Sequence, residues 1–262
     1  MAVFTKTYNP NRSSDWNYGG KNWRLSRSKI DLFIECPRCF YLDNKLGTGR
    51  VRGPAFTLNV AVDALFKKEF DHYRREKLPH PIMKQYRLDA LPYVHKDLEM
   101  WRDNFKGLEY KDPETGLLIS GAVDDIWENS KGALIVVDYK ATSKAEHIES
   151  LSDSPWEEQY HRQIGVYQWL LEHMGFTVAD EGYFVYANAI SDADTFNNTL
   201  HFETTLVPCE GKRDWIDLTL TSIKECLESV EVPASGPQCE YCPYREAAGK
   251  KLQALYTQKT KS

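Results

Sequence analysis

Three charged residues in otherwise apolar stretches carry the strongest chemical signal in the sequence. Asp124 lies late in the apolar run 117–127, Asp138 lies late in a second run, 133–139, and Lys140 follows two residues after Asp138. Side chains alternate between the two faces of a strand, so Asp138 and Lys140 share a face. If the strands pair, the two carboxylates lie side by side and repel unless a cation holds them. Such oxygen ligands suit Mg²⁺ or Mn²⁺, and a lysine beside them can hold a phosphate or orient a water.

Charge at the end of a strand also has a simpler explanation. A strand-end aspartate is frequently only a turn residue, and an exposed lysine is usually solvated. The third charged residue, Asp124, comes about one strand earlier in the chain and favours the metal site.

Two strands and a helix are needed to position these groups. The polar turn 128–132 contains a glycine and separates the two apolar runs, so the region predicts a β-hairpin. A helix is predicted at 156–174, where a buried stripe consists of Tyr160, Ile164, Tyr167, Leu170 and Leu171. Gln163 and Tyr167 are four residues apart and share a helix face. They are candidates to contact nucleic acid, although a tyrosine on such a helix is more commonly a core residue.

The remaining patterns predict a mixed α/β fold around a small sheet. A capping-box pattern at Ser28 predicts a helix that runs into Cys36. Other helices are expected at 55–76, 94–106 and 213–229, and other strands at 181–188 and 199–207. We expect one domain over residues 25–250, after a loosely ordered arm (1–24) and before a frayed tail (251–262).

Composition and charge indicate where the protein works better than they indicate what it does. The chain has 262 residues and a net charge of −5, which gives no general attraction to nucleic acid. No apolar run approaches the roughly 20 residues of a membrane span, and the first residues lack the apolar core of a signal peptide. We therefore expect a cytoplasmic protein without a membrane partner.

Cysteine spacing gives the second strong signal. Cys36 and Cys39 form one Cys-x-x-Cys pair and Cys239 and Cys242 form another, about 200 residues later in the chain. Together they supply the number of thiolates required by tetrahedral zinc or by a cubane iron–sulfur cluster. The alternative is a set of ordinary thiols without metal. A metal here would join the N-terminal helix to the C-terminal segment and stabilise the fold directly.

In combination, these motifs resemble a known nuclease family. The series Gly121-x-x-Asp124, Asp138-x-Lys140 and Gln163-x-x-x-Tyr167 resembles the three motifs of RecB-type nucleases in the PD-(D/E)XK superfamily. Cysteines on both sides of such a core resemble the iron–sulfur members, which include the AddB nuclease domain and CRISPR-associated RecB-like exonucleases. The resemblance implies a restriction-endonuclease-like core with a central mixed sheet flanked by helices.

The resemblance also implies residue roles. Asp124, Asp138 and the carbonyl of Tyr139 would bind Mg²⁺ or Mn²⁺, and Lys140 would position the attacking water or stabilise the phosphate. Gln163 and Tyr167 would hold the DNA strand or orient Lys140.

Two departures from the family pattern stand out. Asn59 stands where many members have a metal-binding histidine, and Asp63, one turn on, is placed to compensate. The cysteines are arranged two and two, where the family usually has one before the core and three after it. A 4Fe-4S cluster is the expected occupant, with Zn²⁺ as the alternative.

We therefore predict a metal-dependent deoxyribonuclease, an exonuclease acting on single strands or DNA ends in repair, recombination or CRISPR-like processing. A helicase or CRISPR-type protein is a possible partner. The alternative is a catalytically inactive nucleic-acid-binding module or a subunit of a larger complex. A third and weaker hypothesis is a metal-clamped protein-interaction domain.

Overall fold

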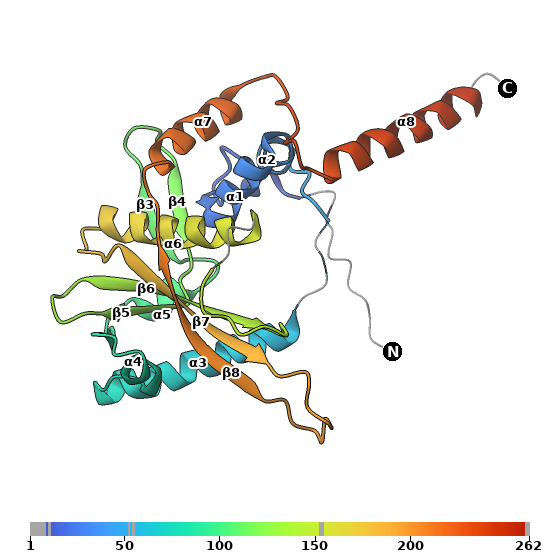
Figure 1. The fold of residues 1–262 in the computed structure, drawn as a ribbon. Helices are drawn as coiled ribbons and strands as arrows, with labels where there is room; N and C mark the ends of the chain where they lie inside the picture. The colour runs from blue at the N-terminus through green and yellow to red at the C-terminus, as the bar shows by residue number, and fades with distance from the viewer. Residues whose placement is uncertain (1–8, 10–11, 52, 54–55, 152–154, 260–262) are drawn as a thin grey trace. The chain divides into compact units, whose positions relative to one another are not determined.

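The structure is a computed structural model that describes residues 9, 12–51, 53, 56–151 and 155–259 (Figure 1). The chain forms two compact units. The first unit comprises residues 1–54, 113–117 and 217–262, and the second comprises residues 55–112 and 118–216. No described helix combines the length and apolar character needed to cross a lipid bilayer.

Helices dominate the first unit. Its elements are η1 (Ser14–Trp16), β1 (Leu25–Ser26), α1 (Arg27–Glu35), α2 (Pro37–Asn44), α7 (Ile216–Glu228) and α8 (Tyr241–Lys259). The predicted helix before Cys36 is present, but the predicted capping box at Ser28 is wrong. Ser26 is the N-cap residue, and Arg27 binds the Asp31 carboxylate at 2.7 Å, so that carboxylate does not cap the helix.

The expected flanking segments fall partly on regular structure. The arm (1–24) includes η1, and its residues 1–8 and 10–11 lie outside the described residues. The tail predicted from residue 251 begins inside α8, and residues 260–262 lie outside the described residues. The division into one domain over 25–250 with two flanking segments stays a prediction.

The second unit is built around a five-stranded sheet. Its helices are α3 (Thr57–Glu76), α4 (Pro81–Gln85), α5 (Leu98–Arg102) and α6 (Pro155–His173). Its strands are β2 (Leu91–Pro92), β3 (Leu108–Lys111), β4 (Leu118–Gly121), β5 (Asp125–Glu128), β6 (Leu134–Thr142), β7 (Glu181–Ala189) and β8 (Phe202–Glu210).

This central sheet is mixed, which confirms the predicted fold class. The strand order is β2-β5-β6-β7-β8. The β6–β7 pair is parallel, and the other neighbours are antiparallel. Parallel neighbours require a crossover, and α6 supplies it.

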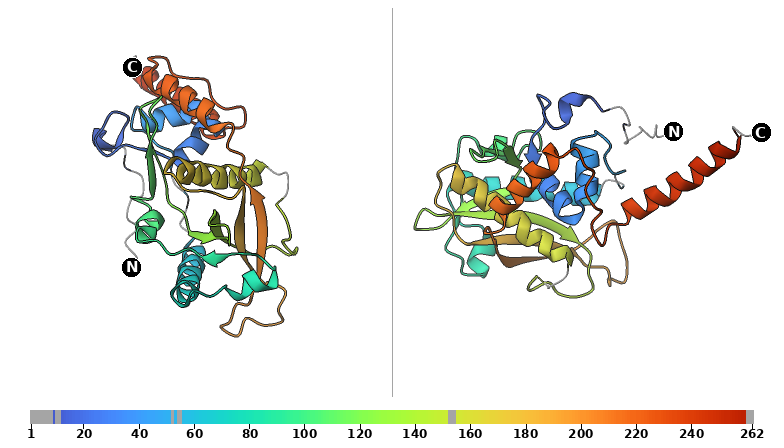
Figure 2. Two further views of the ribbon diagram at one scale, coloured as in Figure 1. Left: turned by 90° about the vertical axis from the view of Figure 1, so that its left-hand side faces the viewer. Right: turned by 90° about the horizontal axis from the view of Figure 1, so that it is seen from above.

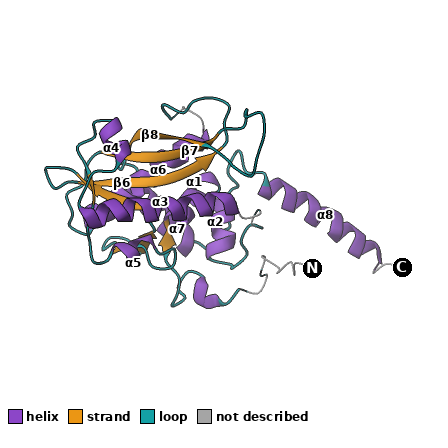
Figure 3. Ribbon diagram, turned by 90° about the horizontal axis from the view of Figure 1, so that it is seen from below, coloured by secondary structure: helices purple, strands orange, loops and turns teal. Residues whose placement is uncertain are grey.

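Helices cover both faces of the sheet, as Figures 1 and 2 show for α3 and α6. Phe66 and Phe70 of α3 pack on the odd-numbered side chains of β6 (Ile135, Val137 and Tyr139) in one buried cluster. In Figure 3, α3 runs beside β6. The even-numbered residues of β6 therefore face α6.

The predicted hairpin forms between β5 and β6, but its first strand is shorter than expected. The run 117–127 splits into β4, which pairs with β3, and β5, which pairs with β6. The split follows from a tertiary contact, because the N–H of Val123 donates to the carbonyl of Trp101 at 3.1 Å. Asp124 lies in this break. The helix expected at 94–106 is likewise only α5, because Asp103 accepts the N–H groups of Phe105 and Lys106 and the helix ends there.

Gly121 ends β4 where α6 passes closely. A Cβ atom at this position would lie 2.7 Å from the Tyr167 ring. Only glycine leaves room for that ring, so the glycine of the first motif and the tyrosine of the third are packing partners.

A buried carboxylate ties the elements around the site together. Asp125 is fully buried, and it accepts hydrogen bonds from Arg74 of α3, from Arg102 of α5 at 2.8 Å and from the Tyr139 hydroxyl of β6 at 2.7 Å. A buried charge is tolerated only when it is paired and hydrogen-bonded. This network therefore fixes two helices and two strands relative to one another.

Removal of this carboxylate is expected to cost more stability than a surface ion pair. Asp125→Ala leaves Arg74 and Arg102 with the partly exposed Asp71 but without their fully buried partner, so the free energy of unfolding should fall by about 3–5 kcal/mol. Denaturant unfolding followed by circular dichroism measures the change.

Glu99→Ala is the matched control. Glu99 binds the same Arg102 at 3.2 Å, but its side chain is 83% exposed. Its loss should cost no more than about 1 kcal/mol. Equal destabilisation by the two variants would show that burial of Asp125 has no special role.

Candidate functional site

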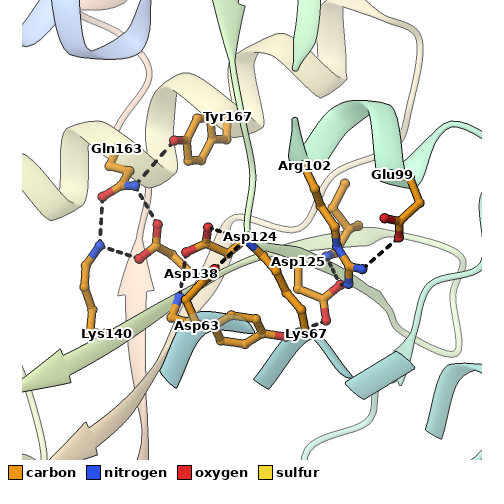
Figure 4. A network of polar contacts seen from close by, with 12 residues as sticks. Asp63, Lys67, Glu99, Arg102, Asp124, Asp125, Asp138, Lys140, Gln163 and Tyr167 are labelled. Carbon is orange, nitrogen blue, oxygen red and sulfur yellow. Dashed lines mark hydrogen bonds and ion pairs between the residues drawn. The ribbon is translucent and has the colours of Figure 1, made fainter. Parts of the chain in front are cut away.

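The strand β6 carries the core of the site. Asp138 is buried and faces α6, together with Lys140. Lys140 donates from Nζ to Asp138 and, at 3.2 Å, to Oε1 of Gln163 (Figure 4). The Gln163 amide in turn donates to Oδ1 of Asp138 at 2.5 Å and lies 3.4 Å from the Tyr167 hydroxyl. The second and third sequence motifs therefore form one hydrogen-bonded network.

Lys140 is a charged group in this network. Burial acts to lower its pKa, but the Asp138 carboxylate outweighs burial, so the pKa of Lys140 is raised above its ordinary value. Its ammonium also lies 4.8 Å from the ring centre of Tyr160 and 5.2 Å from that of Phe184. These aromatic faces favour the cation.

Asp124 joins this network through the backbone. Its Oδ2 atom accepts the N–H of Tyr139 at 3.0 Å, which places the first-motif carboxylate beside the peptide between Asp138 and Tyr139. The Tyr139 side chain points to the other face of the sheet, toward Asp125. The side chain of Asp124 is 25% exposed, so the site is open to solvent on this side.

The helix α3 contributes two charged residues to the site. Sequence analysis named Asp63 only as a substitute for Asn59, and it did not identify Lys67. Lys67 lies 2.9 Å from Asp63 and 3.4 Å from Asp124 (Figure 4). Burial and the nearby Asp124 carboxylate raise the pKa of Asp63, which reflects the electrostatic repulsion between the two carboxylates. Asp63 and Lys67 are four residues apart, and this i, i+4 acid–base spacing was the available sequence signal.

Asn59 does not lie with Asp63 and Asp124. Its Nδ2 atom donates to the carbonyl of Ala141 at 2.7 Å, at the far end of β6. This bond anchors the first turn of α3 to the strand. Asp63, one turn later, is the residue of α3 that lies with Asp124.

The arrangement offers oxygen ligands to a cation. In the structure the Lys67 ammonium lies between Asp63 and Asp124, which shows that these oxygens attract positive charge. Carboxylate oxygens in a partly exposed site are the ligands that Mg²⁺ and Mn²⁺ prefer. Asp63 and Asp124 therefore offer the type of ligand that a divalent ion prefers.

The four cysteines gather in the first unit, as the spacing predicted. Cys36 lies between α1 and α2, and Cys39 is in the first turn of α2. Cys239 precedes α8 and Cys242 lies at its start. All four are buried, and their sulfur atoms lie within 4.8 Å of one another. This is the only group of three or more such ligands among the described residues.

Backbone N–H groups favour the thiolate form of one member. Burial opposes ionisation of Cys36, but the N–H groups of Gly236 and Cys39 outweigh it and lower the pKa of the thiol to about 7. A thiolate is the form that binds metal. Burial raises the pKa of Cys39 to about 12 and also raises that of Cys242, so the close approach of the four sulfur atoms, and not thiol ionisation, suits the cluster to a metal that joins the N- and C-terminal segments of the first unit.

Comparison with protein-family models identifies the superfamily of the chain. A comparison with curated proteins finds no match. Among solved structures, the chain is similar to one titled "Crystal structure of SSO0001", with 15% sequence identity over 80% of this chain and 79% of that chain and a TM-score of 0.40. The model of the PD-(D/E)XK nuclease superfamily matches residues 53–247, which include the whole hydrogen-bonded network. The chain belongs to the PD-(D/E)XK nuclease superfamily.

Proposed function

We propose that this protein is a divalent-metal-dependent nuclease that hydrolyses phosphodiester bonds in DNA. One observation carries the proposal: a charged Lys140 is bonded to Asp138 and Gln163, while Asp124 binds the adjoining peptide of Tyr139. A strand that served only the core would not have buried these groups together.

Asp124, Asp138 and the carbonyl of Tyr139 are the proposed ligands of Mg²⁺ or Mn²⁺. Such an ion supplies Lewis acidity at a phosphoryl oxygen and activates a water. The chain itself supplies the orientation of these ligands, because the Asp124 carboxylate is tied to the peptide N–H of Tyr139 and the Asp138 carboxylate to Gln163.

Lys140 is proposed to act as a cation. Because its pKa is raised, it donates hydrogen bonds to a phosphate oxygen or to the attacking water and does not accept a proton. Gln163 accepts from Lys140 and donates to Asp138, which supports a role in orienting both. The near-complete burial of Gln163 and Tyr167 favours this role over direct contact with a DNA strand.

From α3, we propose Asp63 as the metal-binding residue. The resemblance placed Asn59 at the position of the metal-binding histidine, but the side chain of Asn59 is bonded to the carbonyl of Ala141. Asp63 carries a negative charge beside Asp124, and Lys67 balances that charge.

The finer points of the function rest on the resemblance to RecB-type nucleases. We propose exonucleolytic action on single-stranded DNA or DNA ends, in repair, recombination or CRISPR-like processing, with a helicase or CRISPR-type protein as a possible partner. Cys36, Cys39, Cys239 and Cys242 lie as metal ligands would, which is the use that paired cysteines usually have in a reducing compartment such as the cytoplasm. The presence of the lysine, both aspartates and the glutamine favours an active enzyme over an inactive binding module.

A cleavage assay tests the proposal. Labelled single-stranded DNA, double-stranded DNA and RNA are incubated with the protein in Mg²⁺, Mn²⁺ or EDTA. We expect products from DNA that depend on the metal. DNA binding without products in either metal would instead support the inactive module.

Asp138→Asn and Lys140→Met should each lower the cleavage rate by at least about 100-fold. The first variant removes the charge of a metal ligand, and the second removes the cation that faces the phosphate. The rate is measured under single-turnover conditions, and DNA binding is measured separately by fluorescence anisotropy in EDTA.

Lys131→Met is the matched control. Lys131 is an exposed lysine in the turn of the same hairpin, so its loss should leave the rate within about twofold. Parental cleavage rates in the Asp138 and Lys140 variants would exclude this site as the nuclease centre.

Asp63→Ala and Asn59→Ala should separate the two candidates on α3. Asp63→Ala is expected to weaken Mn²⁺ binding by roughly tenfold or more, because it removes a charged oxygen ligand. Asn59→Ala should change Mn²⁺ affinity by less than about twofold, since its amide is bonded to the backbone. Titration calorimetry on metal-free protein gives both affinities. The reverse order of effects would assign the ligand to Asn59.

A further inference from the structure

The spacing of the four cysteine sulfurs limits what they can hold. Cys36 and Cys242 have sulfur atoms 3.7 Å apart. The sulfur of Cys39 lies 3.6 Å from that of Cys239 and 3.6 Å from that of Cys242. These separations are too long for a disulfide, whose sulfurs are about 2.05 Å apart.

A single tetrahedral ion requires this spacing. With Zn–S bonds of about 2.3 Å, the sulfurs of a tetrahedral site stand about 3.8 Å from one another. In a cubane cluster each thiolate binds a different iron at an outer corner, so the sulfurs stand roughly 6 Å apart. Because all four sulfurs here lie within 4.8 Å of one another, the site fits one ion and is too small for a 4Fe-4S cluster.

Every sulfur also accepts an N–H group. Cys36 accepts the backbone N–H groups of Gly236 at 3.2 Å and of Cys39 at 3.4 Å. Arg245 donates to the sulfur atoms of Cys39 at 3.2 Å and Cys242 at 3.5 Å. Such donors are the usual outer shell of thiolates that bind a metal.

Arg50 supplies the donor for the remaining sulfur. Its Nη2 atom lies 3.4 Å from the sulfur of Cys239. The guanidinium is held in place by the Glu35 carboxylate at 2.7 and 2.8 Å and by the Tyr241 ring, whose centre is 4.3 Å away. The contacts with Glu35, Tyr241 and Cys239 together fix the position of the Arg50 guanidinium beside the cysteine cluster.

We propose that Cys36, Cys39, Cys239 and Cys242 hold one Zn²⁺ in a tetrahedral site, with Arg50 and Arg245 as its charged outer shell. Four thiolates and one Zn²⁺ carry a net charge of −2, and the two guanidiniums offset it. This assignment departs from the iron–sulfur cluster that the resemblance implied. It is independent of the nuclease proposal, since it concerns a site in the other unit of the chain.

The two arginines also close the site on one side. Both line a cavity of about 490 Å³, together with Tyr241 and Tyr244 at the start of α8. Loss of either guanidinium would bring the thiolates closer to solvent in this cavity. The outer shell should therefore control how fast a chelator removes the ion.

Metal content tests the identity of the ion. The full-length protein is produced in minimal medium with both iron and zinc and is purified without oxygen or chelator. We expect about one zinc per chain by mass spectrometry and no visible absorption. Iron in any stoichiometry, with the colour of iron–thiolate bonds, would overturn the assignment.

Cys36→Ser and Cys226→Ser complete that test. Cys36→Ser should lose the zinc, whereas Cys226→Ser, which changes a half-buried thiol of α7 outside the cluster, should keep it. If Cys36→Ser does not fold, Co²⁺ exchanged into the parent protein gives the same answer. The intense visible bands of tetrahedral cobalt thiolate are expected, and weak octahedral bands would contradict the site.

Arg50→Gln and Arg245→Gln should release zinc to a chromogenic chelator about 10–100-fold faster than the parent. Arg38→Gln is the matched control, because Arg38 binds Glu246 and the carbonyl of Pro233 in the same unit but no sulfur. Circular dichroism before release confirms that each variant is folded. Equal rates of zinc release from all three variants would show that Arg50 and Arg245 do not stabilise the bound ion.

Discussion

The buried carboxylate of Asp125 is the constraint on which the second unit depends. Two neighbouring aspartates, Asp124 in the break between β4 and β5 and Asp125 at the start of β5, point in opposite directions, as adjacent residues of an extended chain do. Asp125 turns inward to Arg74, Arg102 and Tyr139, and so ties α3, α5 and β6 to β5. Asp124 is left at the open side. The carboxylate that we propose as a metal ligand is therefore positioned by a neighbouring one that is fully paired.

The site also has an internal charge balance. On one side, Lys140 pairs with Asp138, and on the other, Lys67 pairs with Asp63 and lies near Asp124. On α3, the acidic residue Asp63 is followed one turn later by its partner Lys67. The additional carboxylate thus brings its own counter-charge, which limits the repulsion among three aspartates before a metal binds.

Sequence patterns predicted the parts of the molecule that are set locally. The continuous apolar run predicted the strand β6, and the apolar stripe predicted the helix α6. The two Cys-x-x-Cys pairs predicted the cysteine cluster. What depends on tertiary contacts was not predicted. The strand break at Asp124 arises from a bond to Trp101, and nothing local distinguishes the buried Asp125 from its neighbour. Asn59 was preferred to Asp63 because helix register relative to a strand cannot be obtained from spacing alone.

The separation of oxygen and sulfur ligands into different units has a consequence for metal selectivity. Aspartate oxygens prefer hard ions that exchange rapidly, whereas a set of four thiolates prefers soft or borderline ions and retains them. Mg²⁺ does not replace the ion of the four thiolates, whereas Zn²⁺ also binds carboxylate oxygens. A fall in free magnesium would therefore empty the proposed nuclease site and leave the thiolate site filled, so the chain would stay folded while its chemistry stops.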